Sequence, residues 1–167
     1  SAGGTVQIGN GPATYTSGNI VVTAKSGDID LTSTYGGAVQ IGNGPAGDGP
    51  GKQITGNITV TATNGNITLS SQYKYGVVQI GHGLARDVSG NITVTAGGDI
   101  SLTSEQKYSV VIIGHDGADG STAGNITVTA GGAVSLYSAV SVGASVAQIG
   151  NGGPDMDGNA SGDIVVS

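Results

Sequence analysis

The stretch GNITVTAGGDISLTS, residues 90–104, contains two similar phrases in which Gly and a polar residue precede an Ile. In the first phrase Ile92, Val94 and Ala96 alternate with threonines. A two-residue period predicts a short strand with one buried face, and the β-branched residues favour a strand over a helix. Two glycines, which accept the backbone angles of a tight turn, separate the phrases. The stretch therefore predicts two short strands joined by a turn.

Three such phrases recur in a fixed order along the whole chain. The phrase V/A-x-I-G repeats every 33 to 39 residues, at Ile8, Ile41, Ile80, Ile113 and Ile149. The phrase G-N/D-I-x-V begins at residues 18, 56, 90, 124 and 162, and a third phrase, x-I/V-x-L, lies within the stretches that begin at residues 27, 65, 98 and 132. Repeats of this length predict stacked structural units. We expect one domain, residues 1–167, with units that begin near residues 5, 38, 77, 110 and 145.

The repeats predict an all-β fold, a parallel β-helix (β-solenoid). Short strands without helical crossovers can satisfy their backbone groups by pairing with the equivalent strand one unit along. The spacing favours a three-sided coil of 33–39 residues per unit, although two smaller coils per unit also fit. Equivalent residues would then form interior columns about 4.8 Å apart. One such column is Ile20, Ile58, Ile92, Ile126 and Ile164.

The composition restricts both the core and the partners. The chain has 33 Gly, no Phe, no Trp and no Cys, so its core must be narrow and it has no disulfides. A net charge of −6 with only five Lys and Arg argues against nucleic acid as a partner. No apolar run is long enough for a transmembrane helix, so we expect no membrane insertion. We also find no catalytic motif, and expect a protein that is not an enzyme and that needs no cofactor.

Six threonines repeat as T-x-T on three successive units and form a candidate ligand face. We expect them to point outward in two flat columns. The array resembles the face of β-solenoid ice-binding proteins, which implies ice as one ligand. The six residues are Thr59, Thr61, Thr93, Thr95, Thr127 and Thr129.

Oxygen-bearing side chains near the end of the sequence form a candidate calcium site. They stand at alternate positions, as in calcium loops, but the central Gly and terminal Glu of an EF-hand are missing. A solvated turn of Gly and Asp explains the stretch equally well. The candidate metal ligands are Asp155, Asp157, Asn159 and Asp163.

Two polar columns flank the V/A-x-I-G phrase. His82 and His115 occupy the position held by Asn in the other units, and we favour a structural turn position over a metal site. The glutamines of the phrase are expected to be structural and to face outward. They are Gln7, Gln40, Gln79 and Gln148.

The alternation of GNITVTAGG with GDISLTS, spaced by VQIGHG phrases, resembles the repeat region of filamentous-haemagglutinin-like exoproteins and related large bacterial surface adhesins. The resemblance covers nearly the whole chain. It implies a right-handed parallel β-helix that is secreted to the bacterial cell surface and acts as a stiff stalk or adhesive fibre. No catalytic residue is carried over.

The sequence lacks a capping segment at either end of the repeats. Solenoid ends expose unpaired strand edges, which normally need covering. We therefore expect either self-association end to end or continuation in a longer chain. Host or surface glycans are the other expected partners.

Overall fold

The computed structural model describes residues 4–11, 13–44, 53–116, 120–139, 144–152 and 158–167. Within these ranges every regular element is a β-strand, and no helix long and apolar enough to cross a membrane is present. The chain forms a parallel β-solenoid of about four turns, with coils of about 34 residues. The predicted fold class is confirmed, with one coil per repeat.

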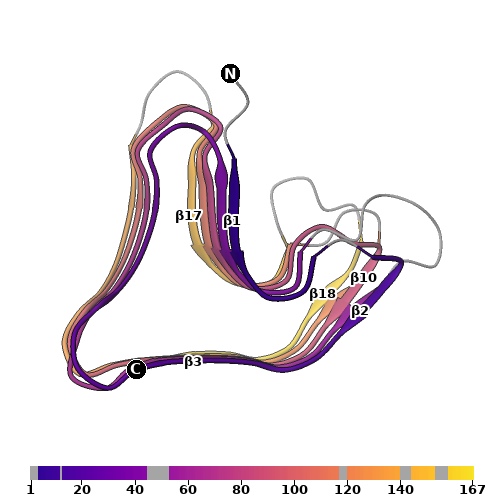
Figure 1. The fold of residues 1–167 in the computed structure, drawn as a ribbon, viewed down its shortest axis with the longest axis horizontal. Helices are drawn as coiled ribbons and strands as arrows, with labels where there is room; N and C mark the ends of the chain where they lie inside the picture. Colours follow the sequence, from indigo (N-terminus) through magenta and orange to yellow (C-terminus); the bar gives the residue numbers. More distant parts are fainter. Residues whose placement is uncertain (1–3, 12, 45–52, 117–119, 140–143, 153–157) are drawn as a thin grey trace.

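Four parallel sheets run along the solenoid, and we name each by its place in the coil (Figure 1). The notch sheet contains β1 (Thr5–Ile8), β5 (Ala38–Ile41), β9 (Val77–Ile80), β13 (Val110–Ile113) and β17 (Val146–Ile149). The tip sheet contains β2 (Tyr15–Ser17), β6 (Gln53–Thr55), β10 (Asp87–Ser89), β14 (Thr122–Ala123) and β18 (Ala160–Ser161). The base sheet contains β3 (Ile20–Ala24), β7 (Ile58–Ala62), β11 (Ile92–Ala96), β15 (Ile126–Ala130) and β19 (Ile164–Val166). The outer sheet contains β4 (Ile29–Ser33), β8 (Ile67–Ser71), β12 (Ile100–Ser104) and β16 (Val134–Ser138).

The coil therefore carries four strands, one more than the three expected. The three predicted phrases form the notch, base and outer sheets, and the tip sheet is the addition. Its strands are two or three residues long and follow segments of variable length, so they show no repeated alternation in the sequence.

Viewed down its axis, the solenoid has an L-shaped outline (Figure 1). The notch and outer sheets face each other in one arm, the base sheet forms the foot, and the tip sheet rises at the far end of the second arm. The two arms enclose a notch, and the chain turns sharply at the elbow between them. A Cβ atom on Gly81, at this elbow, would collide with the carbonyl oxygen of Gly114 in the next coil, so only glycine fits there.

Pairing in register turns the repeated phrases into continuous columns of one side-chain type. Ile92 pairs with Ile58 on one side and Ile126 on the other, and all three are fully buried. Leu69 and Leu102 form an equally buried column in the outer sheet. Truncating a buried Ile or Leu typically costs about 2–5 kcal/mol, so these columns are the main source of stability.

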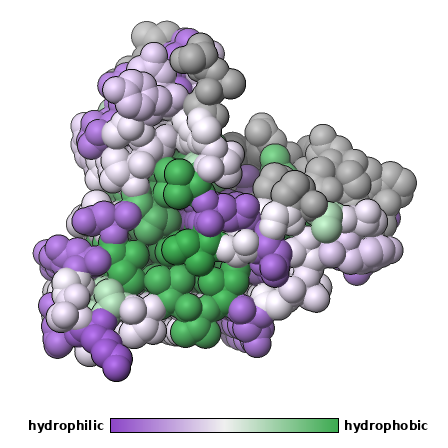
Figure 2. All heavy atoms as spheres, viewed as in Figure 1, coloured by the Kyte–Doolittle hydropathy of each residue, from purple (hydrophilic) through white to green (hydrophobic). Residues whose placement is uncertain are grey.

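The columns end at open faces. In the first coil Val6 and Ile8 remain 65% and 50% exposed, and at the other end Ile164 and Val166 remain 49% and 47% exposed. The end that faces the viewer in Figure 2 shows apolar residues gathered in the middle of the outline, with polar residues around them. The interior hydrocarbon therefore meets solvent at the ends of the described solenoid.

Candidate functional site

The base sheet brings the six predicted threonines together on its outer side. Thr59, Thr93 and Thr127 are in register, and the second threonine of each strand forms a parallel column. All six are partly exposed, as expected for outward residues of this sheet. Valines replace threonine in the first column at both ends, at Val21 and Val165. The array therefore spans three coils.

The candidate calcium ligands are only partly visible. Asp155 and Asp157 lie outside the described residues. Asn159 and Asp163 are exposed, and the backbone N–H of Asp163 donates a hydrogen bond to Asn125 Oδ1 at 2.9 Å. In the part of the chain that the structure describes, no group of three or more His, Cys, Asp or Glu side chains is placed to hold a metal ion. The calcium site stays a prediction.

A polar column crosses the elbow from coil to coil, and we call it the elbow column. In each rung the side chain accepts a hydrogen bond from the backbone N–H of the equivalent residue one coil earlier. The acceptors are Oδ1 of Asn43, Nδ1 of His82, Nδ1 of His115 and Oδ1 of Asn151, at 3.1, 3.1, 3.3 and 3.4 Å. The elbow column consists of Asn10, Asn43, His82, His115 and Asn151.

In every rung after Asn10, the far end of the side chain reaches across to a glycine carbonyl before the base sheet. His82 Nε2 lies 2.8 Å from the Gly56 oxygen, and His115 Nε2 lies 2.7 Å from the Gly90 oxygen. Because Nδ1 accepts a hydrogen bond, the proton resides on Nε2, which donates to the carbonyl. Both nitrogens of each ring are thus engaged, and neither is free to bind a metal. This arrangement agrees with the structural interpretation of the two histidines.

The two imidazoles are stacked and buried, and this keeps them neutral. Their ring centroids lie 4.9 Å apart with an angle of 11° between the planes. Burial lowers the pKa of His115 to about 4, against a smaller opposing effect of its hydrogen bond to Gly90 and with a further lowering by His82. Burial also lowers the pKa of His82. A charge on either ring would abolish the acceptor on which the preceding coil depends.

The glutamine column lines the notch, and the expectation that it would be exposed is wrong at Gln40 and Gln79. These side chains are only 7% and 4% exposed, and their amides lie against backbone carbonyls of the elbow. Gln40 Nε2 donates to the Gly81 oxygen at 2.9 Å, and Gln79 Nε2 donates to the Gly114 oxygen at 2.9 Å. The glutamines therefore satisfy the carbonyls of the glycine corners.

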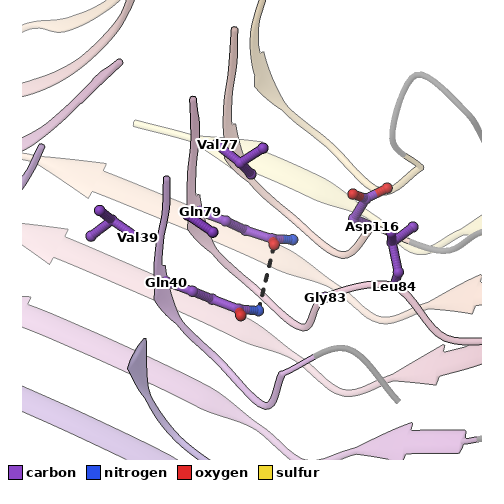
Figure 3. A pocket seen from close by; sticks show the side chains of 8 residues that line it. Val39, Gln40, Val77, Gln79, Gly83, Leu84 and Asp116 are labelled. Atoms are coloured by element: carbon purple, nitrogen blue, oxygen red, sulfur yellow. Dashed lines mark hydrogen bonds between the residues drawn. The ribbon is translucent and has the colours of Figure 1, made fainter. Parts of the chain in front are cut away.

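A small pocket of about 170 Å³ opens beside these glutamines (Figure 3). Its lining is mainly apolar, and Asp116 is the only titratable side chain in it. The imidazoles of the elbow column donate to glycine carbonyls and are not among the lining residues. The pocket has room for a small apolar group. It is lined by Ala38, Val39, Gln40, Val77, Gln79, Gly83, Leu84 and Asp116.

Tyrosines and lysines cluster at the turns that join the outer sheet to the notch sheet. We call this cluster, formed by residues 34–37, 72–76 and 105–109, the apex. The Tyr75 and Tyr108 rings are stacked with centroids 5.3 Å apart and planes 6° apart. Lys74 Nζ lies 4.6 Å from the Tyr75 centroid and 5.9 Å from that of Tyr108, and Lys107 Nζ lies 4.7 Å from the Tyr108 centroid. The apex is thus an exposed aromatic surface that carries two ammonium groups.

Two of the four apex tyrosines adopt an unfavourable backbone conformation. Tyr75 and Tyr108 have φ of 65° and 60°, in the left-handed region that costs a non-glycine residue roughly 1–2 kcal/mol. The equivalent turn of the first coil has Gly36 with φ of 72°. Sequence reasoning missed this site because the first turn is one residue shorter than the next two, which hides the equivalence. The signal was the repeated Lys-Tyr before a strand.

Comparisons with known proteins add no relative. No family model, no curated protein and no solved structure matches the chain. The resemblance to filamentous-haemagglutinin-like exoproteins therefore stays a prediction.

Proposed function

We propose that this protein is a non-enzymatic structural segment of an extracellular bacterial surface fibre or adhesin, whose coils stack end to end with a further solenoid. One observation carries the proposal: the interior columns run without a break and are open at both ends. Val6 and Ile8 at one end and Ile164 and Val166 at the other belong to columns that are fully buried in the central coils. An exposed apolar strand edge is a template for pairing with another chain.

The two ends have matching sequences, which supports stacking between copies. β1 has the sequence TVQI and β17, at the opposite edge of the same sheet, has VAQI. In the base sheet, β3 begins IVV and β19 is IVV. A second copy placed on β17 and β19 would continue each column with the same class of side chain.

Among the described strands, the outer sheet has one strand fewer than each of the other three sheets. Its last described strand, β16, lies in the fourth coil, whereas β17, β18 and β19 belong to a fifth. Among the described strands, β16 is the edge of the outer sheet at this end, and its Leu136 is 45% exposed.

Two adjacent residues of β19 provide the direct test. Val166 lies in an interior column and Val165 in the outward column, and they are 47% and 53% exposed. In sedimentation velocity, the wild type should form larger species as its concentration rises, and electron microscopy should show filaments. Val166→Lys should abolish this association and Val165→Lys should retain it. A wild type that stays monomeric, or two variants that behave alike, would refute end-to-end stacking.

Ice binding is a second candidate function, favoured by the in-register threonine columns of the base sheet. Three coils place pairs of hydroxyl and methyl groups on one flat, partly exposed surface. Thermal hysteresis is the measurement. Thr93→Lys should remove it, whereas Ser101→Lys, on the outward side of the neighbouring β12, should not. A wild type without hysteresis would end this candidate.

A further inference from the structure

The apex contains large apolar side chains that the fold leaves in solvent. Tyr75 and Tyr108 are 57% and 42% exposed, although each has one ring face covered by the other. A second pair, Tyr35 and Tyr73, is 79% and 51% exposed with centroids 6.4 Å apart. The buried columns do not include any of these rings. The aromatic surface is therefore additional to the core.

The backbone also indicates that these tyrosines serve something other than folding. The turn requires a left-handed residue, and the first coil meets this requirement with Gly36. The next two coils place Tyr75 and Tyr108 there and thereby retain strain. Strained conformations of bulky residues are concentrated at ligand sites.

The charge of the apex differs from that of the rest of the molecule. The chain has a net charge of −6 and only five Lys and Arg, yet two of these, Lys74 and Lys107, lie one coil apart at the apex. The only ion pair among the described side chains joins Arg86 and Asp87, so neither lysine is paired there with a carboxylate. The ammonium of Lys74 is charged at neutral pH, and its side-chain hydrogen bond with Tyr75 raises its pKa further. Two neighbouring ammonium groups attract an anion.

We propose that the apex is a binding site for an acidic glycan. The exposed tyrosine faces take the apolar C–H face of a sugar ring, and the ammonium groups of Lys74 and Lys107 take the carboxylate of a uronic acid residue. An exposed aromatic surface with two cations against it suits a ligand that is apolar on one face and anionic at its edge. A polysaccharide also presents such units repeatedly, as the solenoid presents its coils.

The site is independent of end-to-end stacking, because its two lysines and its stacked tyrosine pair lie in the second and third coils. The test therefore uses both the wild type and the Val166→Lys variant, in native gels that contain polygalacturonate or, as the neutral control, dextran. Polygalacturonate should retard both proteins and dextran should retard neither. Retardation of the variant separates this proposal from the proposed fibre function, since either can fail alone.

Two double variants identify the residues responsible. Lys74→Gln/Lys107→Gln and Tyr75→Gly/Tyr108→Gly should each weaken binding by at least about tenfold, as loss of a central contact typically does. Glycine suits the left-handed positions, so the second variant should keep a melting temperature at or above that of the wild type. Glu105→Gln, which removes an acid from the same turn, should strengthen binding about twofold to threefold by reducing like-charge repulsion.

Matched controls lie outside the apex. Tyr15→Ser removes a more exposed tyrosine at the tip sheet, and Lys25→Gln removes a lysine at another corner. Both variants should bind as the wild type. Three results would overturn the proposal: no retardation by polygalacturonate, equal retardation by dextran, or apex variants that bind normally. In the first case, apex variants that also lose self-association would identify a second copy of the chain as the ligand.

Discussion

The aliphatic columns of the base sheet and the elbow column are both buried and both repeat once per coil, but they are stabilised differently. Ile58, Ile92 and Ile126 are fully buried and offer no polar atom, so their contribution is the removal of hydrocarbon from water. His82 and His115 are equally buried, and every ring nitrogen has a hydrogen-bond partner. The first region depends on apolar volume, and the second depends on pairing.

This difference explains why the repeat tolerates His in place of Asn but keeps Ile so strictly. A rung of the elbow column needs an acceptor near the backbone and a donor that reaches a glycine carbonyl, and both amide and neutral imidazole provide these. The column therefore conserves a pattern of hydrogen bonds between coils. The histidines are a variation of a structural rung and not a separate site.

A charge in the aliphatic column should have the largest effect. Ile92→Asp places a carboxylate where no polar partner exists, and should cost more than about 4 kcal/mol and prevent folding. Far-ultraviolet circular dichroism of the purified variant would show loss of strand structure. Thr93→Ser, the outward neighbour, should change stability by less than about 0.5 kcal/mol. A large loss at Thr93 would contradict the assigned facing.

Replacing a polar side chain of the elbow column with an apolar one should have the next largest effect on stability. His115→Leu leaves the N–H of His82 and the carbonyl of Gly90 buried without partners, which should cost about 2–5 kcal/mol. His115→Asn restores the chemistry of the other rungs and should cost much less. Urea unfolding of the two variants measures the difference. Equal losses would mean that ring volume, and not hydrogen bonding, matters at this rung.

Acid should weaken the elbow column selectively. His115 has a pKa of about 4 in the folded protein, against an ordinary value of 6.5, so between these values the unfolded chain binds a proton that the folded chain does not. Stability should therefore fall by roughly 3 kcal/mol as the pH drops from 6.5 to 4, with no further loss from this group below that range. The difference between wild type and His82→Asn/His115→Asn, measured by urea unfolding across the range, isolates the effect. If the free energies of unfolding of the two proteins changed in parallel with pH, the predicted contribution of the histidines would be refuted.

Substitution of two serines in the outer sheet should have the smallest effect on stability, and the two substitutions should differ from each other. Ser104 Oγ donates to the Ser109 carbonyl at 3.0 Å, whereas the buried Ser71 Oγ, one coil earlier, has no hydrogen-bond partner among the described residues. Ser104→Ala should cost about 1 kcal/mol, and Ser71→Ala should be neutral or slightly stabilising. Thermal unfolding of the pair decides this. A greater loss at Ser71 would show that its hydroxyl is satisfied.

The sequence predicted the solenoid because three of its four sheets contain phrases with strict alternation. The register of Ile92 with Ile58 and Ile126 follows from aligning those phrases. The tip sheet escaped prediction because a strand such as Gln53–Thr55 has a single inward residue, Ile54, and too few positions to show a period. The tip-sheet strands were not predicted because they are short, and not because they lack pairing.

The candidate sites were less predictable, because they depend on how the coil bends. Gln40 and Gln79 alternate as outward residues should, but they are buried against the glycine corners of the elbow, whose carbonyls accept their amide hydrogen bonds. The threonine columns lie on the flat base sheet, where alternation alone decides exposure. The equivalence of Gly36, Tyr75 and Tyr108 became visible only from strand register, since the turns differ in length.

The ladder hydrogen bonds that join one coil to the next point along the solenoid axis, and this has a mechanical consequence. Tension along the axis would load the hydrogen bonds of all four sheets at once. The force needed to detach the first coil should therefore be high. Ile80 and Ile113 pair across one such coil, whose 33 residues would then extend by roughly 110 Å. A rod of this kind would lengthen in discrete steps under load, and the remaining coils would stay folded during each step.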